Sequence, residues 1–125
     1  MKTLLCLLAL VLVGAAAPKQ QDPDPLRFTY VDVYVDSGRA LIVGVEGGED
    51  AAFAEPPYHD PAALQGGEIV LAAFHTGHAG PAGRTRVARL HLAVRGDAPV
   101  DFTTTLEVAA SDAGRLPEAT LTLAR

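Results

Sequence analysis

Apolar and polar residues alternate with a period of two in four separate stretches of this chain, a pattern typical of strands that bury one face. In FTYVDVYV, residues 28–35, three valines share one face, while two tyrosines and an aspartate share the other. The same alternation recurs in residues 86–94, 101–109 and 119–124. Helical periodicity is limited to one turn, predicted at residues 60–64. The chain is therefore predicted to be all-β, an antiparallel β-sandwich.

Two other stretches, residues 40–46 and 68–74, are apolar on both faces. This composition predicts central strands that are covered on both sides. In residues 101–109, Leu106 and Val108 are both predicted to face inward. The predicted core gathers the inward positions of these strands: Val31, Val33, Leu71, Leu90, Leu92, Phe102, Leu106 and Leu121.

The N-terminus has the features of a secretory signal peptide, predicted at residues 1–17. Lys2 supplies the positive charge, and an apolar run over residues 4–13 is followed by small residues. That run is shorter than the ~18 residues that a membrane span needs. Residues 18–25, PKQQDPDP, are polar and proline-rich, which predicts a flexible leader before a domain at residues 26–125. The expected location is outside the cytoplasm, either secreted or periplasmic.

Charge and cysteine content narrow the classes of function. Fifteen Asp and Glu residues outnumber ten Lys and Arg, for a net charge of −5. The arginines are scattered rather than gathered in a stripe, so nucleic acid binding is not expected. The single cysteine, Cys6, lies within the predicted signal peptide. A disulfide framework is therefore not expected either.

Five stretches in order, "VDVYVDSG", "IVGVEGGE", "PPYHDPAAL", "GGEIVLAAF" and "GRTRVARLHLAV", resemble a secreted bacterial member of the cohesin-like group. The resemblance spans roughly residues 28–110 and rests on strand pattern and spacing rather than on a catalytic signature. It implies a jelly-roll-like sandwich, the fold that cohesins share with carbohydrate-binding module families 2 and 3. It also implies a binding or scaffolding role.

The sequence departs from the cohesin-like pattern after its first strand. Cohesin-like domains usually place one or two more strands there, whereas this chain has only Ser37, Gly38 and Arg39. We interpret this as a deletion, absorbed by a tight hairpin between residues 28–35 and 40–46. If Gly38 has positive φ in that turn, a β-branched residue in its place should destabilise the domain. Such a shortening would leave one sheet edge open, so weak self-association or strand addition is expected there.

Several histidines and carboxylates could form a metal or catalytic site, or they could be ordinary loop residues. His75 and His78, with His59 and His91, could supply zinc nitrogens, and Asp60 or Glu49 an oxygen. The acidic loop at residues 46–50 could hold calcium, although it lacks the regular alternation of an EF-hand. We expect no cofactor, with calcium as the alternative. The sequence singles out no pair of carboxylates for hydrolysis, and both serines lie in predicted turns. A catalytic function is therefore not expected.

Two features of the sequence favour a role in binding a partner. The connection at residues 47–67 contains Phe53, Tyr58, His59 and Asp60, and two adjacent prolines stiffen the approach to Tyr58. The outward face of residues 28–35 carries the remaining candidates, which are Tyr30, Asp32 and Tyr34. Two tyrosines on one strand face could form a flat platform. Alternatively, Phe53 and Tyr58 could cap the end of the core.

The favoured function is a secreted, non-catalytic module that recognises a protein partner with a dockerin-like segment. The first alternative is a polysaccharide-binding module, which is less favoured because the chain has no Trp, the strongest stacking side chain. The second alternative is a metal-dependent hydrolase of unknown substrate.

Overall fold

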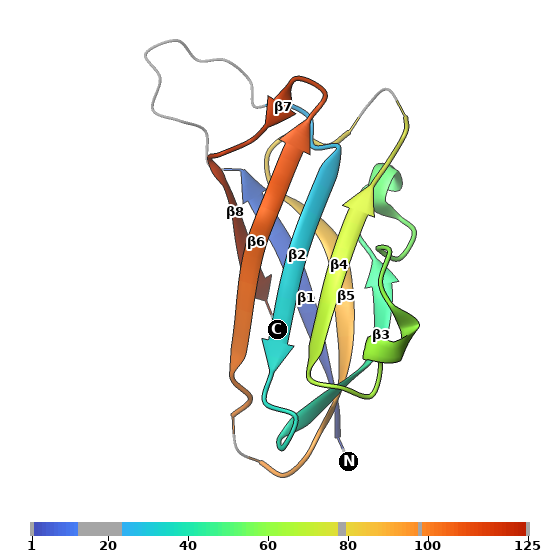
Figure 1. The fold of residues 1–125 in the computed structure, drawn as a ribbon, viewed down its shortest axis with the longest axis vertical. Helices are drawn as coiled ribbons and strands as arrows, with labels where there is room; N and C mark the ends of the chain where they lie inside the picture. Colours follow the sequence, from blue (N-terminus) through green and yellow to red (C-terminus); the bar gives the residue numbers. More distant parts are fainter. Residues whose placement is uncertain (1, 13–23, 78–79, 98, 125) are drawn as a thin grey trace.

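The computed structural model describes residues 2–12, 24–77, 80–97 and 99–124. Its elements are eight strands and two short 3-10 helices (Figure 1). In chain order they are β1 Lys2–Leu12, β2 Phe28–Val35, β3 Ala40–Gly47, η1 Ala51–Phe53, η2 Pro61–Ala63, β4 Glu68–Phe74, β5 Thr85–Val94, β6 Phe102–Ser111, β7 Gly114–Arg115 and β8 Ala119–Ala124.

These strands form two antiparallel four-stranded sheets that pack face to face (Figure 1). Sheet A has the order β3-β5-β1-β8, and sheet B has the order β4-β2-β6-β7. The all-β, antiparallel sandwich predicted from the alternation is confirmed. It follows from that alternation, because each sheet has one apolar face that only another apolar face can cover.

The core lies between the sheets and contains the inward positions of β2, β3, β4 and β5. Five of the predicted core residues are buried, and Phe102, Leu106 and Leu121 are partly buried and packed against them. A second cluster at one end of the sandwich joins Leu26, Phe53, Ala73, Val87 and Ala109. Leu26 is fully buried in this cluster.

A β-bulge in β6 reverses the faces of its last residues. Leu106 pairs with Val31, but the next pair joins Val108 to Tyr30, so one residue of β6 is left out of the ladder. An extra residue shifts the alternation by one position. Val108 therefore shares the outward face of Tyr30, and Ala109 is buried in its place. The prediction that Val108 faces inward was wrong for this reason.

The two stretches predicted to be central strands, β3 and β4, instead lie at the edges of their sheets. Their outer edges are covered by the connection between them, which runs down the side of the sandwich (Figure 1). Ile42 of β3 bridges to Gly66, and Ala72 of β4 bridges to Tyr58. Backbone pairing with a loop reduces the number of open donors and acceptors at each edge. An apolar second face did not indicate a central position here.

The predicted hairpin between β2 and β3 is also wrong, because the two strands belong to different sheets. Residues 36–39 cross from sheet B to sheet A in a tight turn, in which the amides of Arg39 and Ala40 both donate to the Asp36 carbonyl oxygen at 2.9 and 3.0 Å. Gly38 is not among the glycines with positive φ. Its amide donates to the Asp36 side chain at 2.9 Å, so an Asx turn rather than a left-handed residue shapes this crossing.

The N-terminal segment that the sequence predicts to be a signal peptide forms β1 in this structure. The other parts of that prediction, residues 1 and 13–17, lie outside the described residues, as does most of the leader, residues 18–23. Signal cleavage and export remain predictions. In the part of the chain that is described, no helix has the length and hydropathy to cross a membrane.

Candidate functional site

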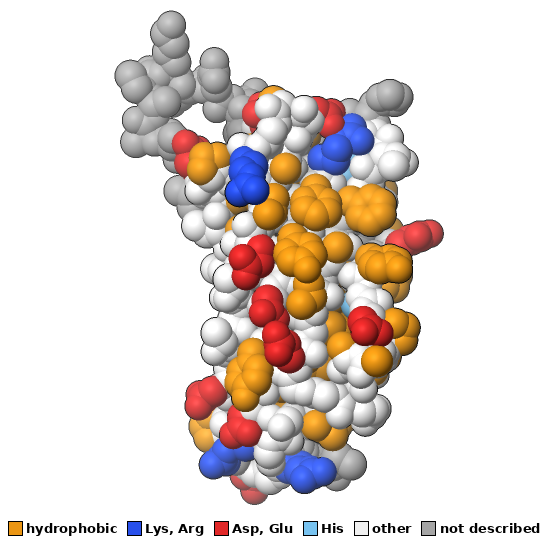
Figure 2. All heavy atoms as spheres, viewed as in Figure 1, with side chains coloured by type: hydrophobic (Ala, Val, Ile, Leu, Met, Phe, Trp, Pro, Cys, Tyr) orange, Lys and Arg blue, Asp and Glu red, His pale blue; other side chains and the backbone are white. Residues whose placement is uncertain are grey.

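Four large hydrophobic side chains are exposed on the outer face of sheet B, and we call them the aromatic patch: Tyr30, Tyr34, Tyr58 and Phe74. Their exposed fractions are 40%, 52%, 77% and 58% in that order. Figure 2 shows hydrophobic side chains gathered on this face over β2 and β4. A cluster of exposed rings is costly in water unless something covers it, so it is a candidate contact surface.

Strand register explains why residues from three segments meet in the patch. Tyr30 of β2 pairs with Ala72 of β4, and Ala72 pairs on its other side with Tyr58. Residues directly opposite each other in a ladder point to the same face. Phe74 lies two residues beyond Ala72 and therefore also points outward. One row across the sheet thus aligns Tyr58 with Tyr30.

Carboxylates border the aromatic patch. Asp32 lies between the two tyrosines of β2, opposite Val70 on one side and Thr105 on the other. One of its carboxylate oxygens is shielded from solvent and has no hydrogen-bond partner among the described residues. Glu68 pairs with Tyr34 at the far end of β4. The acidic side chains in Figure 2 run beside the hydrophobic ones on this face.

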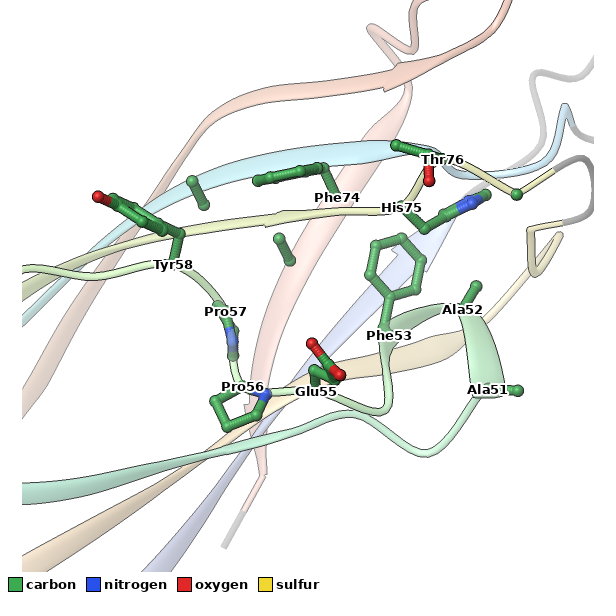
Figure 3. A pocket seen from close by; sticks show the side chains of 13 residues that line it. Ala51, Ala52, Phe53, Glu55, Pro56, Pro57, Tyr58, Phe74, His75 and Thr76 are labelled. Carbon is green, nitrogen blue, oxygen red and sulfur yellow. The ribbon is translucent and has the colours of Figure 1, made fainter.

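A hollow of about 580 Å³ adjoins the patch, between the end of β4 and the loop that contains η1. It is lined by residues 51–53, 55–58 and 72–77. In Figure 3 the carboxylate of Glu55 and the ring of Phe53 point from the loop towards β4. Tyr58 and Phe74 contribute both to this hollow and to the aromatic patch. The hollow and the patch therefore form one continuous surface.

The inner wall of the hollow is closely packed and hydrogen-bonded. Phe53 is 3% exposed, and its ring meets the ring of His75 edge to face, with 5.2 Å between the centroids and 87° between the planes. His75 Nε2 lies 2.9 Å from the Leu26 carbonyl oxygen, and because a carbonyl can only accept, Nε2 carries the proton. Arg27 donates to the carbonyl oxygens of His75 and Gly77 at 3.2 and 2.9 Å and so holds the adjoining rim.

The loop itself is fixed by two side-chain caps. Asp50 accepts from the Ala52 amide at the start of η1, and Asp60 accepts from the Ala62 amide at the start of η2, both at 2.9 Å. The predicted helical turn at residues 60–64 corresponds to η2. These caps satisfy amides that a short helix leaves unpaired. They also give Asp60 a structural role.

Tyr58 is held by its backbone rather than by its ring. Its amide donates to the Ala72 carbonyl oxygen at 2.8 Å, and the Ala72 amide donates to the Tyr58 carbonyl oxygen at 2.9 Å. Pro57, which precedes it, is buried, and the His59 ring contacts the Pro57 carbonyl oxygen at 2.9 Å. A side chain presented from an ordered backbone loses less entropy when it binds.

The histidines that could supply zinc nitrogens are not brought together among the described residues. His91 lies on the outer face of sheet A, His75 lies in the wall of the hollow, and His78 lies outside the described residues. The part of the chain that is described contains no group of three or more His, Cys, Asp or Glu side chains placed to hold a metal. In the loop considered for calcium, Glu46 instead contacts His91 Nε2 at 2.8 Å.

The Glu46 carboxylate carries a testable electrostatic signature. The hydrogen bond to His91 lowers its pKa below 4.5, and the charges of His91 and Arg89 act in the same direction. A depressed pKa means that this contact stabilises the fold above pH 4.5 and is lost as the pH falls through the lower, folded-state value. An NMR titration of Glu46 should give a midpoint below 4.5, and His91→Ala should raise it. An unchanged midpoint in that variant would exclude the contact with His91 as the cause.

Of the seven predicted site residues, the structure places Tyr30, Tyr34 and Tyr58 in the patch, with Asp32 between the two strand tyrosines. Phe53 lies beneath the surface, in the wall of the hollow, and His59 and Asp60 lie in the loop. The sequence does not single out Phe74, because the apolar composition of residues 68–74 predicts a strand that is covered on both sides. Phe74 lies an even number of residues after Val70 and Ala72, so strand alternation places all three on the same face. This spacing is the sequence signal that could have identified Phe74.

The backbone is similar to a chain in the crystal structure of a cohesin–dockerin complex, with a TM-score of 0.59. The sequences are 14% identical, and the match covers 90% of this chain and 79% of that chain. At this identity the likeness concerns the fold, which is a cohesin-like β-sandwich. The sequence matches no protein-family model and no curated protein.

Proposed function

We propose that this chain is a secreted, non-catalytic binding module that recognises a protein partner through the outer face of sheet B. The observation that carries the proposal is the aromatic patch, in which four exposed rings from β2, β4 and the intervening loop share one face. Aromatic residues supply large contact area with few rotatable bonds, and they are enriched where protein interfaces bind most strongly.

The acidic residues around the aromatic patch favour a protein partner over a purely apolar one. Asp32 lies between the two tyrosines of β2, and Glu55 and Glu68 are exposed nearby. These groups suit a partner that brings Lys, Arg or amide donors to the rim of an apolar contact. The cohesin-like fold adds a specific candidate, because the similar chain is part of a cohesin–dockerin complex. The proposed partner is a secreted protein with a dockerin-like segment.

A catalytic role has less support in the geometry of the hollow. Among the described residues that line it, the carboxylate is supplied by Glu55, and the His75 ring is committed to the Leu26 carbonyl oxygen through Nε2. Hydrolysis by paired carboxylates needs two acids across a cleft. The metal-dependent hydrolase alternative lacks a described ligand cluster.

The test is binding by the exported domain and by matched variants. Tyr34→Ala and Tyr58→Ala should each weaken binding to a purified partner with a dockerin-like segment by at least roughly tenfold in Kd, as expected for central aromatic contacts. Leu41→Ala, on the outer face of sheet A, is the control and should leave Kd unchanged. Circular dichroism should show that all three variants remain folded.

The same variants distinguish the polysaccharide alternative, which the row of exposed tyrosines also supports. Retention on insoluble polysaccharide that is lost in Tyr34→Ala, without binding to any dockerin-like segment, would replace the protein partner with a carbohydrate. Protein binding that survives both tyrosine substitutions but fails in Leu41→Ala would place the contact on sheet A and contradict the proposal.

A further inference from the structure

The strand β1 occupies an interior position in sheet A, between β5 and β8 (Figure 1). It pairs antiparallel with β5 from Lys2 to Leu10 and antiparallel with β8 from Leu7 to Leu12. The strands β5 and β8 are therefore joined within the sheet only through β1. An interior strand supplies backbone partners on both sides, so the sheet depends on it more than on an edge strand.

The same residues carry the sequence features of a signal peptide, a positive residue followed by an apolar run and then by small residues. A segment that is cleaved during export cannot remain the covalent β1 of the mature protein. Cleavage would leave facing edges of β5 and β8 without partners. Leu90 and Leu92 on β5 and Leu121 and Leu123 on β8 pack in the core beside that opening.

In the described part of the mature chain, no strand is left over to fill the opening. The leader at residues 18–25 contains Pro18, Pro23 and Pro25, and proline cannot donate to a ladder in the interior of a sheet. The strands β2, β3, β4 and β6 are already paired in the two sheets. A second mature copy has the same strands in the same places, so it offers no spare apolar strand either.

We propose that signal cleavage opens a strand-acceptor site between β5 and β8, and that the mature protein binds there an extended, apolar, proline-free segment of a different protein. The segment that fits is defined by the strand seen in place, KTLLCLLALVL, which has one charged residue in eleven. It runs antiparallel to both neighbours, with a register shift between Leu8 and Ala9 where it pairs with β5. This site is separate from the aromatic patch, and it rests on cleavage rather than on the proposed function.

Binding at such a site is strand addition in which the guest strand pairs along both of its edges. A guest at a sheet edge pairs along one side, whereas a guest between β5 and β8 pairs along both. It also covers apolar side chains that would otherwise meet water. The site would select its guest by the alternation of inward and outward side chains along the guest strand, and by excluding proline and charged residues. It would not depend on a single pocket.

The test begins with the exported protein, whose N-terminus is determined by intact mass. Hydrogen exchange should then show poor protection of the β5 and β8 amides that face β1 in this structure. The β5 amides that pair with β3, and the amides of β2, should stay protected. A self-complemented form carries a copy of residues 2–12, with Cys6→Ser in that copy, after Arg125 on a flexible linker of about ten residues. This length spans the five residues by which β1 overhangs the end of β8, about 17 Å.

The donor copy should raise Tm by roughly 10 °C or more and restore protection in β5 and β8. The matched control replaces Leu5 and Leu8 of the donor copy with proline and should restore neither property. If the exported chain folds only with the intact donor, that result also supports the acceptor site.

Three results would overturn the proposal. Retention of residues 2–12 in the exported protein would make β1 a permanent strand. A monomeric mature chain with β5 and β8 already protected would mean that the sheet closes by itself. A stable homodimer protected in the same strands would make the occupant a second copy.

Discussion

Replacing Ile42 with alanine is expected to lower the free energy of unfolding by about 2–5 kcal/mol, the range for truncating a fully buried aliphatic side chain. Ile42 is 0% exposed and packs in the main core cluster between the two sheets. The loss combines buried apolar area with the cavity that remains, because the surrounding strands are held by their ladders and relax little. Urea unfolding followed by circular dichroism measures the change.

Leu41→Ala is the matched control, since it removes a similar side chain from the adjacent position of the same strand. Leu41 faces outward and is only half-buried. Its substitution should cost clearly less than that of Ile42. Equal losses at the two positions would mean that β3 does not present Ile42 to the core, and the assignment of its faces would be incorrect.

Gly48→Ala is expected to destabilise the domain by about 1–3 kcal/mol, as overpacking at a close contact does. A Cβ atom built at Gly48 would overlap the Arg86 carbonyl oxygen, and the obstacle is backbone rather than a movable side chain. The Gly48 amide also donates to the Phe53 carbonyl oxygen at 2.6 Å. Relief of the clash would therefore displace η1, which forms one wall of the hollow.

Gly77→Ala provides the comparison, because the nearest atom to its added Cβ is His75 Nδ1 at 3.8 Å, an ordinary contact. Neither glycine is among those with positive φ, so backbone strain does not separate the two substitutions. Thermal unfolding should show a lower Tm for Gly48→Ala and little change for Gly77→Ala. A Gly48→Ala variant as stable as the parent would show that the loop does not approach β5 as closely as described.

Alternation by itself determined the fold class and most of the core. Val31 and Val33 on β2 and Leu90 and Leu92 on β5 are buried as their period predicts. The reason is local, because successive side chains of a strand point to opposite faces wherever that strand lies. The outward positions of Tyr30 and Tyr34 follow from the same rule.

The candidate site was only partly accessible from the sequence. Tyr58 was predicted to be significant because two prolines precede it, but its alignment with Tyr30 depends on a backbone bridge to Ala72. Phe74 joins the same surface through the register of β4 against β2. Register between segments far apart in the chain is a property of the assembled sheet, and no single segment carries it.

Strand order was decided by the tertiary structure alone. The apolar composition of β3 and β4 suited a central position, yet both lie at edges that the connecting loop covers. The turn at residues 36–39 suited a hairpin, yet it crosses between the sheets, because its Asx geometry fits either connection. Local patterns set which face of a strand is buried, whereas the partner of each edge is chosen by long-range pairing that competes over the whole chain.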